Sequence, residues 1–179
     1  MDYFNYLRNL ELMNQMQTDY DISRIENEPW PLTFQNKSQQ YLLSKATEHV
    51  KEYILDETED AEFYTRLIAL APNEDQKRII EDIRNDELIH TRIFRKIFTK
   101  LTGVVLPTTP QTSNNKTSES FSYKEGLKKA LFGELDAVKK YRETMAYMPN
   151  KELADMFMYV LTDEIRHADK YNYLISINH

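Results

Sequence analysis

Four segments of the chain carry apolar residues at intervals of three and four positions, the spacing that places side chains on one face of an α-helix. The predicted helices cover about residues 41–71, 74–102, 122–148 and 151–176. Pro72 and Asn73 separate the first two segments, and Pro149 and Asn150 separate the last two. Proline cannot continue a helix, and such short connections make the joined helices antiparallel neighbours. The pattern therefore predicts two helical hairpins.

A polar connection, residues 103–121, joins the two predicted hairpins. It begins at Gly103, a suitable helix stop, and continues with many Ser, Thr, Asn and Pro residues, which favour an exposed link. Fully extended, the link can reach about 60 Å, whereas a helix of about 30 residues is about 45 Å long. The link can therefore cross the length of the hairpins. The fold class predicted for residues 41–179 is an all-α four-helix bundle with a long crossover.

Residues 1–40 are predicted to form an N-terminal helical appendage. An amphipathic pattern over 3–16 favours a short helix, and Pro29 and Pro31 on either side of Trp30 favour a loop after it. The apolar side chains of this segment offer surface that can be buried against the main body or against a second subunit. We therefore expect a homodimer.

Composition excludes several classes of protein. The chain has 179 residues, enough for one domain, and its 3 glycines and 6 prolines favour helix over sheet. A net charge of −6 argues against nucleic acid as a partner. No apolar run approaches the roughly 18–20 residues that span a membrane, and no secretory signal is recognisable, so we expect a cytoplasmic location. The absence of cysteine excludes disulfides, thiolate-held zinc and iron–sulfur clusters.

The sequence contains two copies of Asp-Glu-x-x-His, which begin at Asp86 and at Asp163, an offset of 77 residues. The same offset relates Glu57 to Glu134, Tyr64 to Tyr141, Pro72 to Pro149 and Asn73 to Asn150. A Glu and a His three residues apart lie on one helix face. In both copies that face is the apolar one, where a carboxylate is costly unless it is paired or bound to a metal. The motif residues predicted as metal ligands are Glu87, His90, Glu164 and His167.

Glu57 and Glu134 lie on the apolar faces of the first and third predicted helices. Each precedes its turn proline by 15 residues, and Glu87 and Glu164 each follow theirs by 15. All four carboxylates therefore lie about 22 Å from their turn, at about 1.5 Å per residue. When the hairpins pack together, the six side chains should converge at mid-height. Four carboxylates and two imidazoles suit two hard or borderline metal ions.

Asp86 and Asp163 each precede a motif glutamate and should face a neighbouring helix. Metal-bound imidazole usually donates its other N–H to a carboxylate. We therefore predict a crossed pairing, in which Asp86 accepts from His167 and Asp163 accepts from His90.

Three further residue types have less determined roles. Tyr64 and Tyr141 can either hydrogen-bond a ligand carboxylate on a facing helix or pack in the core with the hydroxyl satisfied elsewhere. Asp60 can touch the edge of the metal centre or lie on the wet surface, which is the usual place for Asp. The duplicated pattern does not require Asp60, because its counterpart is Ala137. His49 lies off the pattern and is expected to be exposed.

These motifs resemble the ferritin-like di-iron carboxylate superfamily, and its rubrerythrin-like branch most of all. In that pattern two helices give one Glu each and two give Glu-x-x-His. The resemblance covers about residues 41–176 and implies a ferritin-like bundle with two iron ions bridged by Glu87 and Glu164. The ligands that it implies are Glu57, Glu87, His90, Glu134, Glu164 and His167. Two departures from rubrerythrins are the absence of a rubredoxin domain and Ala137 in place of a further glutamate.

The resemblance implies a di-iron oxidoreductase of ferroxidase or peroxidase type. Such an enzyme oxidises Fe(II) with O2 or H2O2, for iron handling or peroxide defence, and an external reductant can reset it. Because the ligand set suits manganese as well as iron, a dimanganese catalase-like enzyme is an alternative. A non-enzymatic helical coat or scaffold protein that retains the metal site is another.

Overall fold

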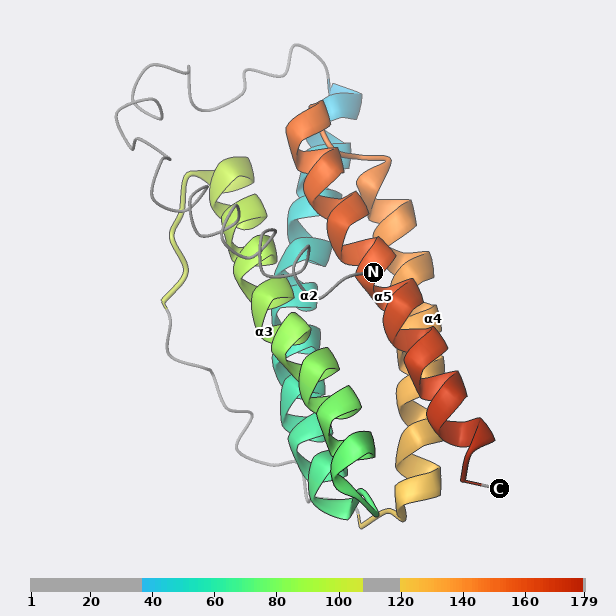
Figure 1. The fold of residues 1–179 in the computed structure, drawn as a ribbon. Helices are drawn as coiled ribbons and strands as arrows, with labels where there is room; N and C mark the ends of the chain where they lie inside the picture. Colours follow the sequence, from blue (N-terminus) through green and yellow to red (C-terminus); the bar gives the residue numbers. More distant parts are fainter. Residues whose placement is uncertain (1–36, 108–119, 179) are drawn as a thin grey trace, which may run out of the picture. The chain divides into compact units, whose positions relative to one another are not determined.

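The computed structural model describes residues 37–107 and 120–178, which form four α-helices and no strand (Figure 1). The helices are α2 (Lys37–Leu70), α3 (Glu74–Thr102), α4 (Tyr123–Met145) and α5 (Lys151–Ser176). The all-helical, four-helix prediction is thus confirmed. The predicted appendage lies outside the described residues, apart from its last four positions. No helix in the described part of the chain is both long and apolar enough to cross a bilayer.

The two helices that follow the turns have the predicted bounds, because asparagine caps both. The Asn73 side chain accepts a hydrogen bond from the Gln76 backbone N–H at 3.0 Å, and the Asn150 side chain accepts from Leu153 at 3.0 Å. These bonds satisfy N–H groups that have no partner within the helix. At the other end of α3, Gly103 adopts the left-handed conformation, with φ 72°. The predicted Pro-Asn turns and glycine stop are therefore present.

Two boundaries differ from the prediction. Helix α2 begins at Lys37, inside the predicted appendage rather than at about residue 41. Residues 37–40 are polar, so no apolar periodicity reveals that they are helical. Helix α4 ends at Met145, three residues before the predicted end. Pro149 accounts for this end, because it has no N–H to donate to the Met145 carbonyl and its ring would clash with that carbonyl in a continued helix.

The two hairpins pack so that their turns lie at opposite ends of the bundle (Figure 1). Helix α2 packs along α3 and α4 along α5, and sparser contacts between α3 and α5 and between α2 and α4 join the hairpins. The Tyr123 hydroxyl, at the start of α4, donates to the Gln76 side chain, at the start of α3, at 2.9 Å. Helix α4 thus begins beside the start of α3, and the two helices run in the same direction.

Two apolar clusters fill the interior, one toward each end of the bundle. The first includes Val50, Phe94, Leu153 and Phe157. The second includes Leu67, Ile80, Leu127 and Leu174. Buried charged residues occupy the level between them. On α3, for example, Glu87 and His90 lie between Ile83 of the second cluster and Phe94 of the first. Apolar side chains therefore cover the polar layer above and below.

Candidate metal centre

All six predicted ligands meet in this polar layer, and none is more than 2% exposed. Helices α2 and α4 contribute one glutamate each, and α3 and α5 contribute a Glu and a His three residues apart. The six residues are Glu57, Glu87, His90, Glu134, Glu164 and His167. The turn distances that were read from the sequence therefore bring four helices to one level.

The ligand atoms form two overlapping groups, each of which could hold a metal ion. In each group one ligand atom per residue lies within 4.8 Å of the others. One group contains Glu57, Glu87, His90 and Glu164, and the other contains Glu87, Glu134, Glu164 and His167. The two groups share Glu87 and Glu164.

The shared carboxylates each direct one oxygen toward each imidazole. Glu87 places Oε2 3.0 Å from His90 Nδ1 and Oε1 3.1 Å from His167 Nδ1. Glu164 places Oε1 3.0 Å from His90 Nδ1 and Oε2 3.7 Å from His167 Nδ1. By contrast, Glu57 approaches only His90, at 3.4 Å, and Glu134 approaches only His167, at 3.6 Å. Two residues are thus placed to bridge two positions, and two are placed to serve one each.

The crossed pairing of aspartates with histidines is present as predicted. His90 Nε2 lies 3.3 Å from Asp163 Oδ2, and His167 Nε2 lies 3.1 Å from Asp86 Oδ2. A carboxylate accepts a hydrogen bond from Nε2–H, so in a neutral imidazole Nδ1 carries the lone pair. In both rings that lone pair would face carboxylate oxygens, which requires a proton or a cation between them.

Three atoms of the centre are buried without a hydrogen-bond partner in the described part of the chain, namely Glu87 Oε1, Glu164 Oε1 and His167 Nδ1. His167 Nδ1 lies 3.1 Å from Glu87 Oε1 but lacks the geometry of a hydrogen bond. Buried polar atoms are normally paired, and each exception needs a cause. A cation between these atoms would satisfy all three. The residues present therefore fit a bound metal.

Tyr64 and Tyr141 hydrogen-bond the two single-position carboxylates, and this selects between the two roles that the sequence allowed. The Tyr64 hydroxyl donates to Glu134 Oε1 at 2.6 Å, and the Tyr141 hydroxyl donates to Glu57 Oε1. Burial raises the pKa of both phenols well above 10, so both remain donors. Each of these glutamates thus has one oxygen held by a tyrosine and the other near an imidazole.

The electrostatics of the centre divide its ionisable groups into proton carriers and carboxylates. Burial, followed by neighbouring acidic groups, raises the pKa of Glu57 and Glu134 well above the usual range. Burial also acts to raise the pKa of Glu87, but hydrogen bonds from Glu57 and both histidines outweigh it and lower that pKa.

The pKa of Glu164 is lowered in the same way: hydrogen bonds from Glu134 and both histidines outweigh burial and the charge of Glu87. Burial acts to lower the pKa of His90 and His167, yet hydrogen bonds to carboxylates, those of Asp163 and Asp86 first, raise both pKa values well above 6.5. Without metal, four groups therefore hold protons: Glu57, Glu134, His90 and His167.

Two other candidates lie outside the centre. Asp60 is exposed and belongs to neither ligand group. His49 is half-buried, and its Nδ1 lies 3.0 Å from Thr144 Oγ1, so the prediction that it is exposed is wrong. The cause is its position beside the α2–α4 contact, where Thr144 is fully buried.

Sequence reasoning missed one residue that contacts the aspartates. Arg166 Nη1 lies 2.5 Å from Asp163 Oδ1, and its Nη2 lies 2.9 Å from Asp86 Oδ2. The spacing of three between Asp163 and Arg166 is a signal for the first contact. The contact with Asp86 depends on how α3 meets α5, and no local spacing reveals it.

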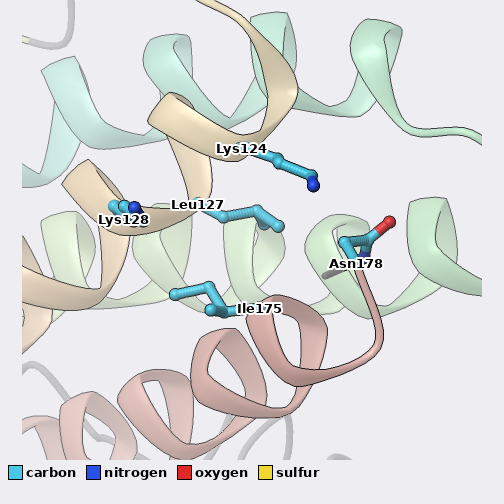
Figure 2. A pocket seen from close by; sticks show the side chains of 5 residues that line it. All are labelled: Lys124, Leu127, Lys128, Ile175 and Asn178. Carbon is cyan, nitrogen blue, oxygen red and sulfur yellow. The ribbon is translucent and has the colours of Figure 1, made fainter.

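A small hollow at one end of the bundle is separate from the centre. Figure 2 shows its lining side chains, Lys124, Leu127 and Lys128 from α4, with Ile175 and Asn178 from the end of the chain. Its volume is about 170 Å³. None of the six ligands lines it, and it offers neither a carboxylate nor an imidazole.

Comparison with known proteins assigns no relative to the chain: no family model matches it, and no curated protein matches it.

Proposed function

We propose that this protein is a di-metal carboxylate oxidoreductase with a ferritin-like bundle, which oxidises Fe(II) with O2 or H2O2. The observation that carries the proposal is the pair of ligand groups that share Glu87 and Glu164. Shared carboxylates are what two ions about 3.5–4 Å apart require. Oxygen and nitrogen donors of this kind suit iron and manganese rather than soft metals.

Two Fe(II) ions supply one electron each, which together reduce H2O2 to two waters or O2 to the peroxide level. The residues of the chain provide the conditions for this. Tyr64 and Tyr141 fix the orientation of the outer carboxylates, and the apolar clusters on both sides exclude water from the polar layer. The sequence has no cysteine for a built-in electron-transfer site. The electrons therefore come from Fe(II) itself or from an external reductant.

Anaerobic loading with Fe(II), followed by addition of H2O2, tests the proposal. We expect two iron ions per chain by elemental analysis and two Fe(II) oxidised per H2O2 consumed, measured by the absorbance of Fe(III). Protein loaded with Zn(II), which does not change oxidation state, is the control.

Anomalous diffraction at the iron and manganese edges identifies the metal of protein purified without added metal. Manganese in the centre, together with disproportionation of H2O2, would replace the proposal by a catalase-like function. Bound metal with no turnover in either assay would favour a scaffold role.

We further propose that two copies associate through the outer face of the α4–α5 hairpin. Phe132, Leu135 and Ile165 are exposed there at 64%, 49% and 51%. The α2–α3 hairpin is a built-in comparison, because the residues 77 positions earlier are Leu55, Thr58 and Leu88. Met158, also exposed, stands where the first hairpin has Glu81. The second hairpin is thus the more apolar of the two, as expected of a contact surface.

Charges beside this face favour a second copy as the partner. Exposed Lys128 and Arg142 lie on α4, and exposed Asp155 and Asp169 lie on α5. A twofold axis parallel to the helices sets α4 of one copy against α5 of the other, so basic side chains meet acidic ones.

Phe132→Glu should convert the dimer to a monomer in sedimentation experiments, because it places a charge in the contact. Leu55→Glu, at the equivalent position of the first hairpin, should leave the dimer intact. A monomeric wild-type protein, or dissociation caused only by Leu55→Glu, would contradict this contact.

A further inference from the structure

Arg166 is the meeting point of the two halves of the metal centre. Its two terminal nitrogens contact different aspartates, Asp163 and Asp86. Those aspartates accept from His90 and His167 respectively. We propose that Arg166 is a positioning residue that holds both aspartates and thereby orients both imidazoles toward the metals. This inference rests on the metal centre of the proposed function, but not on its reaction.

The duplication makes this arginine unusual, because it has no counterpart. Each of the six ligands, both aspartates and both tyrosines has an equivalent 77 positions away. The equivalent of Arg166 is Ile89, which cannot pair with a carboxylate. A single guanidinium therefore serves both copies of the motif. Its planar group carries donors on separate nitrogens, so it can hold two carboxylates at once.

The aspartates need a cation in this position. Both are buried, at 6% and 5% exposed for Asp86 and Asp163, and both lie against the same guanidinium. Within the described part of the chain, their ion pairs other than those with histidine are the two with Arg166. Without it, two buried carboxylates would repel each other and turn away or take up a proton.

A displaced aspartate would release the imidazole that it fixes. Each ring would then be free to change its tautomer or to rotate, and Nδ1 would no longer be held toward the glutamates. Because Arg166 touches both aspartates, we expect its loss to affect both metal positions. Removal of a residue that orients a metal ligand typically lowers metal affinity about 10–100-fold.

The rival interpretation is an ordinary ion pair that joins α3 to α5. The chain offers a matched control for it, since Lys170 on α5 pairs with Asp82 on α3, one helical turn along the same contact. This pair joins the same two helices without touching Asp86 or Asp163. Loss of either pair should destabilise the bundle, but only loss of Arg166 should alter metal binding.

The test compares Arg166→Met, Arg166→Lys and Lys170→Met with the wild type. Co(II) and Mn(II) affinities are measured by calorimetry, the coordination geometry by the visible absorption of the Co(II)-loaded protein, and the stability of the metal-free protein by thermal melting. Arg166→Met should weaken binding of both ions about 10–100-fold and change the Co(II) spectrum. Arg166→Lys should recover part of the affinity, because one ammonium group cannot reproduce both contacts. Lys170→Met should leave affinity and spectrum as in the wild type.

Wild-type affinity and spectrum in Arg166→Met would overturn the inference, and so would an equal loss of affinity in Lys170→Met. If Arg166→Met does not fold, Arg166→Lys decides by the same criteria. A wild-type protein that binds no metal would overturn both this inference and the proposed function. Metal binding without oxidation of Fe(II) would overturn only the proposed function.

Discussion

Glu87→Gln is expected to remove both metal ions from the protein. Glu87 belongs to both ligand groups and directs one oxygen toward each imidazole. The glutamine side chain has nearly the same volume but is neutral and offers only one oxygen, so neither ion keeps its shared anionic ligand. The loss in affinity should exceed about 100-fold, since the loss of an outer residue that only orients a ligand already costs about 10–100-fold. Elemental analysis after gel filtration measures the metal content.

Glu57→Gln provides a sharper comparison, because Glu57 belongs to one group only. It should remove one ion per chain and leave the ion held by Glu134 and His167. Glu62→Gln, at an exposed position of the same helix, should change nothing. Circular dichroism establishes that each variant is folded. If Glu57→Gln and Glu87→Gln lose the same number of ions, Glu87 is not a bridge.

Metal affinity should fall steeply as the pH is lowered. The pKa values of Glu57, Glu134, His90 and His167 are all raised, so each holds a proton that a metal ion must displace. The sign follows from this: lower pH stabilises the protonated, metal-free form and weakens binding. Each displaced proton changes the affinity about tenfold per pH unit below the pKa of its group. Release of about four protons would therefore give a very steep dependence.

Calorimetry with Mn(II) in buffers of different ionisation enthalpy counts the released protons directly. The Glu57→Gln variant is the matched control, because glutamine carries no ionisable proton and one fewer should be released for each ion that still binds there. An affinity that stays constant between about pH 6 and about pH 8 would show that these groups do not hold protons in the metal-free protein.

The helices and the ligand level could be predicted from the sequence because both depend on local signals. Asn73 and Asn150 cap helices in the way that isolated peptides do, and Pro149 forbids continuation of α4 whatever surrounds it. Equal ligand-to-turn distances follow from helix geometry alone. The predicted end of α4 was three residues too late because apolar spacing continues to Met148, beyond the last residue that can bond normally within the helix.

The contacts between hairpins could be predicted only where the duplicated pattern carried them. The crossed aspartate pairs follow from two equivalent motifs on helices that face each other. Arg166 has no equivalent, and half of its side chain is exposed, so in the sequence it resembles any solvated arginine. His49 escaped prediction for a related reason, because its partner Thr144 lies 95 residues away on another helix. The choice between iron and manganese is not encoded in the ligand set, which both metals accept.

The 15 residues between each carboxylate and its turn constrain how this chain can change in length. One residue inserted between Glu57 and Pro72 would rotate the earlier part of α2 by about 100° and shift it by about 1.5 Å, which turns Glu57 out of the interior. Seven inserted residues would nearly restore the orientation but move the glutamate about 10 Å along the bundle. Only a matching insertion in α3 would bring it back level with Glu87. Beyond the ligands, at the start of α2 and the end of α3, no such constraint applies, and helix length there can vary by single residues.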